Sequence, residues 1–96
     1  MGIDELLKHK REQILSIAHA HGALRVKVFG SLARGEATEA SDIDLLVDLK
    51  KGASLLDIVA IKQDIEDLLG RKVEVVTSSS ISPYIREAVL KEAVNL

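Results

Sequence analysis

The sequence predicts one α/β domain of the α+β type, in which a small three-stranded mixed β-sheet is flanked by about four helices. Segments with helical periodicity alternate with short apolar segments that end near glycine, which is typical of this class. The chain has 96 residues, of which 47% are apolar and 29% charged, and a chain of this length builds one core. We therefore expect residues 1–96 to form a single domain.

The first half of the chain is expected to form a helix and two strands. Ile3–His21 carries apolar residues at helical spacing, and Gly22 is suited to end that helix in a left-handed conformation. Leu24–Phe29 is short and rich in valine and phenylalanine, which favours a strand. Ile43–Leu49 is mostly apolar, as expected of a central strand. Between the two strands, Ser31–Glu36 fits a turn and a short helix.

The second half begins with the clearest helical pattern, Ser54–Leu69. Ser54 is suited to cap this helix, and Asp57 lies at the third helical position, where a carboxylate is favourable. Gly70 ends the helix, and Lys72–Thr77 has the composition of a third strand.

The end of the chain predicts a loop and a last helix. Ser78–Ser80 is a cluster of small residues and indicates a loop. Ser82 is expected to cap the helix, and Pro83 fits its first turn. Three apolar residues at helical spacing are expected to form its inner face, namely Ile85, Val89 and Ala93.

The order of elements constrains how the strands pair. The unit from Ile43 to Val76 is a strand–helix–strand crossover, so its two strands should be parallel. Only about a dozen residues around Ser31–Ser41 join the first two strands, and a connection this short allows antiparallel neighbours.

Composition excludes several classes of function. The chain has no cysteine, which excludes a thiol nucleophile, a disulfide scaffold and a cysteine-ligated zinc site. Its net charge of −2 and two aromatic residues argue against strong direct binding of nucleic acid. No apolar run is long enough to cross a membrane, and the charged start of the chain lacks the pattern of a signal peptide. We expect a cytoplasmic protein.

Two aspartates begin the second strand. Asp42 and Asp44 are two residues apart, so both carboxylates point to the same face of the sheet. Like charges at this distance repel unless a cation lies between them, and Mg²⁺ commonly binds one or two carboxylates together with substrate phosphates. The pair therefore predicts a Mg²⁺ site.

A candidate phosphate site follows the first strand. Gly30 has no Cβ, so a phosphate can approach the backbone there, and Ser31 opens a turn whose hydroxyl and N–H groups suit an anion. Arg34 lies on the same turn and can bind a phosphate with its planar guanidinium. If the first two strands are antiparallel, this site lies beside Asp42 and Asp44.

Glu74 is the third candidate acid, near the start of the third strand. Beside the aspartates it would complete a metal site, or it could accept a proton from an attacking hydroxyl. Each motif alone has an ordinary explanation, such as a solvated strand end, a helix N-terminus or an outward residue of an edge strand. Their convergence at one corner of a small sheet favours the functional interpretation.

The same residues carry a family resemblance. Gly30-Ser31, followed after ten residues by Asp42-Ile43-Asp44, is similar to the signature of the DNA polymerase beta nucleotidyltransferase superfamily. The chain resembles its minimal members, the small MNT-domain proteins, several of which act as antitoxins to HEPN-domain ribonucleases. The resemblance implies that Gly30 and Ser31 hold nucleotide phosphates and that Asp42 and Asp44 bind two Mg²⁺ ions. It also implies Glu74 as the third carboxylate, where relatives often have aspartate.

Two functions from different classes follow. The first is Mg²⁺-dependent transfer of AMP from ATP to a hydroxyl, and the resemblance points to a tyrosine of a partner HEPN toxin. The alternative is a non-catalytic binding module that neutralises a partner by docking. A drug-modifying transferase is a weaker option, because such enzymes usually add a helical domain that holds the acceptor. The choice of base, the acceptor and any self-association stay open at this point.

Overall fold

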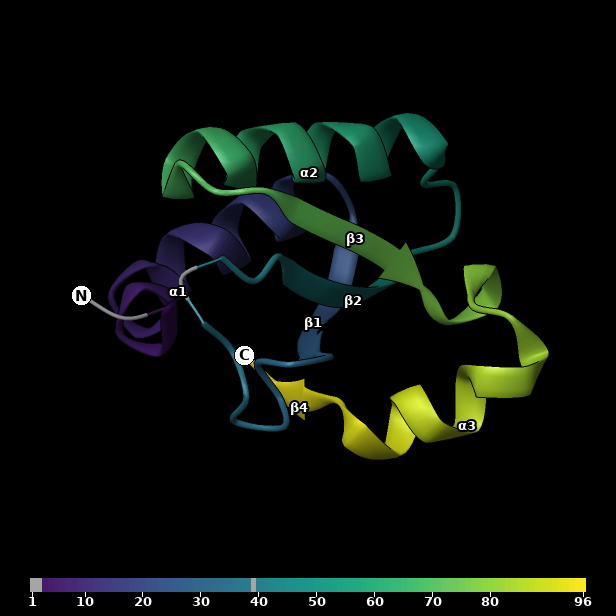
Figure 1. Ribbon diagram of the computed structural model, residues 1–96. Helices are drawn as coiled ribbons and strands as arrows, with labels where there is room; N and C mark the ends of the chain where they lie inside the picture. Colours follow the sequence, from purple (N-terminus) through teal and green to yellow (C-terminus); the bar gives the residue numbers. More distant parts are fainter. Residues whose placement is uncertain (1–2, 39) are drawn as a thin grey trace.

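The computed structural model of the protein describes residues 3–38 and 40–96 (Figure 1). It contains three α-helices, one short 3₁₀ helix and four strands within these residues. In chain order they are α1 (Ile3–Ala20), β1 (Ala23–Phe29), β2 (Ile43–Leu49), α2 (Leu55–Leu69), β3 (Val73–Thr77), η1 (Ser78–Ser80), α3 (Pro83–Glu92) and β4 (Val94–Asn95).

The four strands form one mixed sheet in the order β3-β2-β1-β4. The two predicted pairings are confirmed, because β1 is antiparallel to β2 and β2 is parallel to β3. The fourth strand was not predicted. It consists of Val94 and Asn95, which pair with Val28 and Lys27 of β1. Two residues are too few to show the alternation that identifies a strand in a sequence.

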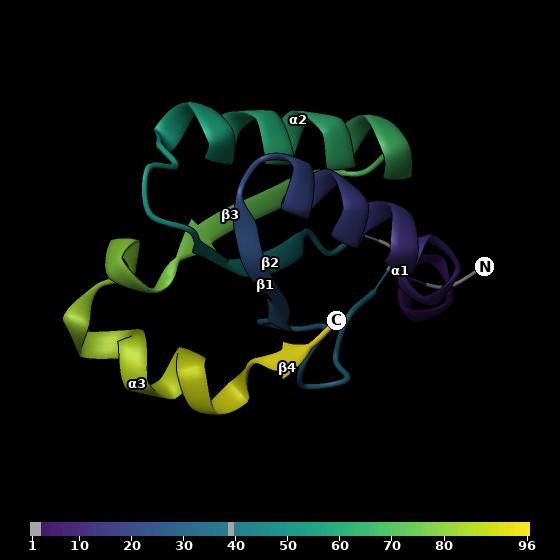
Figure 2. The ribbon, with the colours of Figure 1, turned by 180° about the vertical axis from the view of Figure 1, so that it is seen from behind.

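Helices α1 and α2 cover one face of the sheet. Helix α1 contacts β1, α2 contacts β3, and the two helices contact each other. Figures 1 and 2 show α2 and α3 on opposite sides of the sheet. The core between the sheet and the first two helices contains seven large side chains with no or almost no solvent exposure, from α1 and α2 (Ile14, Ile61, Ile65), from β2 (Ile43, Leu45, Val47) and from β3 (Val73).

Helix α2 begins and ends where the sequence predicts. The Ser54 hydroxyl accepts a hydrogen bond from the N–H of Leu56 at 3.2 Å, and the carboxylate of Asp57 accepts one from the N–H of Ser54 at 2.8 Å. These bonds satisfy N–H groups that have no partner inside the helix. Gly70 ends the helix with φ of 66°, the left-handed conformation that glycine adopts without strain.

Two local predictions are wrong. Residues 31–35 form a series of turns rather than a short helix. Helix α3 has the predicted proline in its first turn, but Ser82 makes no side-chain cap and the helix has no buried residue. Of the expected inner face, the Ile85 side chain is 54% exposed. The periodicity fails here because it shows that a helix has an apolar side and does not show whether a surface covers that side.

No helix among residues 3–38 and 40–96 is long and apolar enough to cross a membrane.

Candidate active site

The pairing of three neighbouring strands gathers the predicted site residues. Phe29, at the end of β1, lies opposite Asp44 of β2, and Asp44 lies beside Glu74 of β3. The Gly30 turn therefore starts next to Asp44, with Glu74 on the other side. The three parts of the predicted site are brought together as the order of the strands required.

Strand parity decides which face holds the acids. Ile43 and Leu45 are fully buried under the helices, so Asp44 between them points to the opposite face. We call this second face, with Asp44, Asp48 and Glu74, the acidic face. Glu74 is exposed and Asp44 is half-buried. The carboxylates are thus accessible to a substrate while the same strand contributes to the core.

Gly30 is required for two separate reasons. Its φ is 73°, which side chains with a Cβ rarely adopt. A Cβ built at this position would also collide with Oδ2 of Asp44. The absence of a side chain at residue 30 therefore leaves room for the carboxylate of Asp44.

The turn after Gly30 is held by its own backbone. The N–H of Arg34 donates to the carbonyl of Gly30 at 3.2 Å, and the N–H of Glu36 donates to the carbonyl of Ser31 at 2.9 Å. Leu32 is buried in the main core and anchors the turn. The half-buried Ser31 is thereby fixed at the end of β1, beside the acids.

Burial and neighbouring charges perturb Asp44. Partial burial raises the pKa of Asp44 above its usual value of 3.8, and the negative charges of Asp42 and Glu74 raise that pKa further. The charge of Arg34 acts in the opposite direction. Close carboxylates of this kind favour a bound cation, and carboxylate oxygens are suitable ligands for Mg²⁺. The donor set therefore fits a divalent metal.

The three acids are neighbours without forming a closed set of ligands. Within the described part of the chain, no group of three histidine, aspartate or glutamate side chains is gathered closely enough to hold an ion. The role of Glu74 as a third metal ligand therefore stays a prediction.

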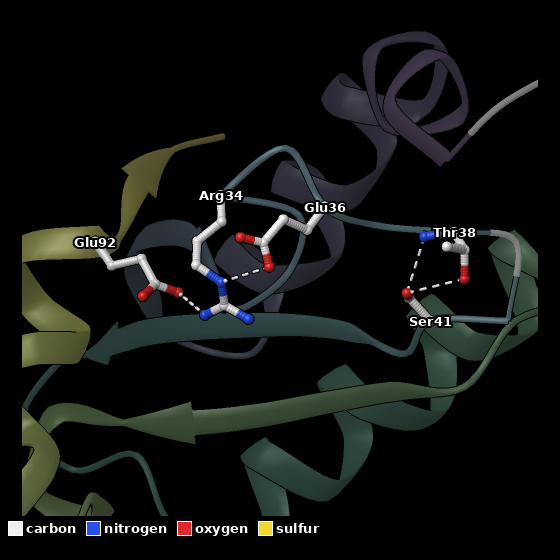
Figure 3. A network of polar contacts seen from close by, with 5 residues as sticks. All are labelled: Arg34, Glu36, Thr38, Ser41 and Glu92. Carbon is white, nitrogen blue, oxygen red and sulfur yellow. Dashed lines mark hydrogen bonds and ion pairs between the residues drawn. The ribbon is translucent and has the colours of Figure 1, made fainter.

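Arg34 lies on the predicted turn, but carboxylates surround it (Figure 3). Its Nε donates to Oε2 of Glu36 at 3.3 Å, and its Nη1 donates to Oε1 of Glu92 at 2.8 Å. These hydrogen bonds raise the pKa of Arg34. Glu92, the last residue of α3, was missed from the sequence because 58 residues separate it from Arg34 and no local pattern links them.

A polar pocket of about 400 Å³ adjoins Asp42 at the start of β2 and β3. Its lining includes Ser41, Asp42 and two cationic residues of the α2–β3 turn, Arg71 and Lys72. The hydroxyl of Ser41 accepts a hydrogen bond from the N–H of Thr38 at 2.9 Å, which fixes the loop that leads to Asp42 (Figure 3). Sequence analysis did not single out Arg71 or Lys72.

A comparison with protein families decides the class of the site. The family model described as a nucleotidyltransferase domain matches residues 10–96. This chain belongs to the nucleotidyltransferase domain family. The match includes the Gly30 turn, Asp42, Asp44 and Glu74, so these residues form the candidate active site of this nucleotidyltransferase.

Named relatives are similar to this nucleotidyltransferase over nearly their full length. A protein of Methanocaldococcus jannaschii, provisionally named a protein adenylyltransferase, is 43% identical over all of this chain and 99% of its own length. The protein adenylyltransferase MntA of Thermococcus cleftensis is 42% identical, over 86% of this chain and 92% of its own length.

Solved structures share its fold. A protein provisionally described as a minimal nucleotidyltransferase is 50% identical, with a TM-score of 0.86 over 96% of this nucleotidyltransferase and 94% of that chain. A chain from a toxin–antitoxin crystal structure with AMP-PNP has a TM-score of 0.74 at 20% identity, over 88% of this chain and 69% of that one. At so low an identity, the second likeness shows the fold alone.

Proposed function

We propose that this nucleotidyltransferase transfers AMP from ATP to a hydroxyl of a partner protein in a Mg²⁺-dependent reaction. The observation that carries the proposal is the strand register, which lines up the Gly30 turn, Asp44 and Glu74 across three strands. A phosphate-binding turn beside paired carboxylates is the arrangement that nucleotidyl transfer requires. The relatives named protein adenylyltransferases support AMP as the group and a protein as the acceptor.

The reaction is an in-line displacement at the α-phosphorus of ATP. The acceptor oxygen forms a bond to that phosphorus, the bond from the phosphorus to the oxygen that bridges to the β-phosphate breaks, and pyrophosphate leaves. Gly30 and Ser31 hold the phosphates, and Glu74 accepts the proton of the acceptor hydroxyl. Asp42 and Asp44 would hold Mg²⁺, which when bound neutralises phosphate charge and lowers the pKa of the hydroxyl.

The partner we propose is a toxin of the HEPN type, with a tyrosine as acceptor, so that modification neutralises the toxin in the cytoplasm. The toxin–antitoxin structures with the same fold are consistent with this role, and so is the name of the Thermococcus cleftensis relative. The described residues form one compact unit around a single sheet and include no further domain that could grip an acceptor. We propose that the partner supplies the acceptor and the surface around it.

The deciding experiment uses the protein encoded next to this one in its genome. That protein is incubated with this chain, ATP and Mg²⁺, and its intact mass is measured. We expect a gain of one or more AMP units that is lost with Asp42→Asn/Asp44→Asn. The matched control is Asp48→Asn, a half-buried aspartate on the same face of β2 that accepts from the Ser78 hydroxyl at 3.4 Å. Equal transfer by the Asp42/Asp44 variant would refute the site assignment.

The alternative is docking without catalysis, and one observation favours it. Helix α3 exposes large side chains, with Tyr84 98%, Ile85 54% and Leu90 41% accessible. Such residues on one short helix are suited to contact a partner. Docking alone would leave co-elution of the two proteins intact in the Asp42→Asn/Asp44→Asn variant and would give no gain in mass with the unaltered chain.

A further inference from the structure

The ion pair between Arg34 and Glu92 joins two distant parts of the chain at the edge of the candidate site. Arg34 belongs to the turn after Gly30, and Glu92 ends α3 (Figure 3). Their nitrogen and oxygen atoms are 2.8 Å apart, and the side chains are 47% and 27% exposed. A second carboxylate, Glu36, contacts the same guanidinium at 3.3 Å. The one arginine on this turn is therefore engaged by carboxylates of the protein itself.

Helix α3 packs loosely, with only Arg86, Val89 and Glu92 half-buried. None of its ten residues is buried. The ion pair of Lys91 with Glu87 lies within the helix, and the Nη2 of Arg86 donates to the carbonyl of Ile81 just before it. The helix is otherwise connected through η1 at one end and β4 at the other (Figure 1). The pair of Glu92 with Arg34 is thus a cross-connection from α3 to the turn of the candidate site.

The pair also lies within electrostatic range of the acids. The negative charge of Glu92 raises the pKa of Asp44, and the positive charge of Arg34 lowers it. A nucleotide bound at the Gly30 turn would bring several more negative charges beside Arg34. A guanidinium binds phosphate through two parallel hydrogen bonds, and a phosphate chain carries more negative charge than a single carboxylate, so it attracts Arg34 more strongly than Glu92 does in their exposed pair. The phosphates and Glu92 therefore compete for Arg34.

We propose that nucleotide phosphates displace Glu92 from Arg34, so that Glu92 is a positioning residue that weakens nucleotide binding and holds α3 against the turn until a nucleotide arrives. The proposal rests on the nucleotide site of the proposed function. Coupling of this kind is reciprocal: nucleotide binding loosens α3, and a looser α3 strengthens nucleotide binding. It assigns a role to the end of α3 that is separate from metal binding and from the transfer step.

The first test measures the dissociation constant of AMP-PNP with Mg²⁺ by calorimetry. Glu92→Gln keeps the size of the side chain and removes its charge, and we expect binding about threefold tighter than in the unaltered chain, an effect that weakens in high salt. Glu87→Gln is the matched control, because this glutamate lies on the same helix, is 85% exposed and pairs only with Lys91 in the contacts described. In Arg34→Gln, the further change Glu92→Gln should have much less effect. Weaker or unchanged binding in Glu92→Gln overturns the proposal.

The second test follows amide hydrogen exchange in α3. We expect AMP-PNP with Mg²⁺ to speed exchange in residues 83–92 of the unaltered chain, whereas Glu92→Gln should exchange fast without nucleotide. Unchanged or slower exchange on nucleotide binding would contradict the coupling. Neither test requires catalysis, so both can succeed even where no AMP transfer is found. A chain that does not bind AMP-PNP at all would overturn this proposal and the nucleotide site together.

Discussion

The two faces of the sheet have opposite physical characters although the same strands build them. Toward α1 and α2, β2 presents Ile43, Leu45 and Val47, all with no exposure. Toward the other side it presents Asp44 and Asp48, with the buried Leu46 between them, beside Glu74 of β3. Because side chains alternate along a strand, each acid on one face is the direct neighbour in sequence of a core residue on the other face. Stability and chemistry can therefore be changed independently, by substituting neighbours in the sequence.

The difference extends to how charges are treated. On α2, the carboxylate of Glu66 accepts hydrogen bonds from Lys62 at 2.8 Å and from the N–H of Val73 at 2.9 Å, and these bonds lower the pKa of Glu66. On the acidic face, the pKa of Asp44 is raised by partial burial and by neighbouring acids. The charge of Asp44, whose neighbours are acids, lowers the stability of the ligand-free fold, and destabilising groups of this kind are common at functional sites. The acidic face is thus prepared for a cation rather than for stability.

The largest effect is expected on the covered face. Leu45→Ala should lower the free energy of unfolding by about 2–5 kcal/mol, because Leu45 is fully buried and its truncation leaves a cavity that the surrounding core can fill only in part. A domain of this size has roughly 5–15 kcal/mol in total. Urea denaturation followed by circular dichroism measures the change. Leu24→Ala, at a side chain 64% exposed, is the control and should be nearly neutral. A loss below about 1 kcal/mol in Leu45→Ala would show that the core is misplaced.

Asp44→Asn, one residue before Leu45, should reduce activity and raise the stability of the metal-free protein. We expect AMP transfer to fall at least about a hundredfold, because Asp44 holds Mg²⁺ in the proposed function. In metal-free protein the melting temperature should rise by about 1–4 °C, since a carboxylate near Asp42 and Glu74 loses its charge at a partly exposed position. Thermal unfolding with and without Mg²⁺ is the measurement. A clear drop in the melting temperature would indicate that Asp44 is structural.

The sequence alone identified the parts of this contrast that depend on order and parity. Glu74 was expected near Asp44 because the strand–helix–strand unit fixes a parallel pair, and the register places the two residues side by side. The caps of α2 followed from local chemistry at Ser54 and Asp57. Interactions of this kind depend on a few adjacent residues or on a single topological rule.

What the sequence did not reveal depends on contacts between distant segments. The pairing of β4 with β1 involves two residues, and the contact of Glu92 with Arg34 spans 58 residues. The packing of α3 was predicted wrongly from Ile85 and its neighbours, because periodicity shows that a helix has an apolar side and does not show whether a surface is there to cover it. Arg34 was predicted to bind phosphate from the chemistry of its guanidinium, and no sequence pattern indicated its hydrogen bonds to Glu36 and Glu92.

A smaller effect is expected at the turn between the two faces. Gly30→Ala and Gly35→Ala place a Cβ at nearly equal φ values, 73° and 72°, so each should cost about 1–2 kcal/mol of stability. Only the Cβ at position 30 collides with Oδ2 of Asp44, whereas nothing lies within 4 Å of the one at position 35. Gly30→Ala should therefore lose transfer activity beyond its loss of stability. Equal activity in the two variants at matched stability would mean that Asp44 tolerates the shift.

The smallest effect is a difference in sign between two acids as the pH falls. Glu66 has a pKa below its usual 4.5 in the folded state, so its stabilising contribution is present above that value and is lost as the pH falls through the lowered pKa. Asp44 has a pKa above its usual 3.8, so the cost of its charge is full above the raised pKa and disappears on acidification. As the pH falls, protonation of Asp44 should therefore add to the stability of the metal-free protein, and protonation of Glu66 should subtract from it. Asp44→Asn should remove the gain, and Glu66→Gln should flatten the loss. Melting curves between pH 7 and about 3 test both signs at once.

If the Glu66→Gln curve ran parallel to that of the unaltered chain down to the lowest pH, the hydrogen bonds to Lys62 and Val73 would contribute nothing to stability, and the contrast between the two carboxylates would depend on Asp44 alone.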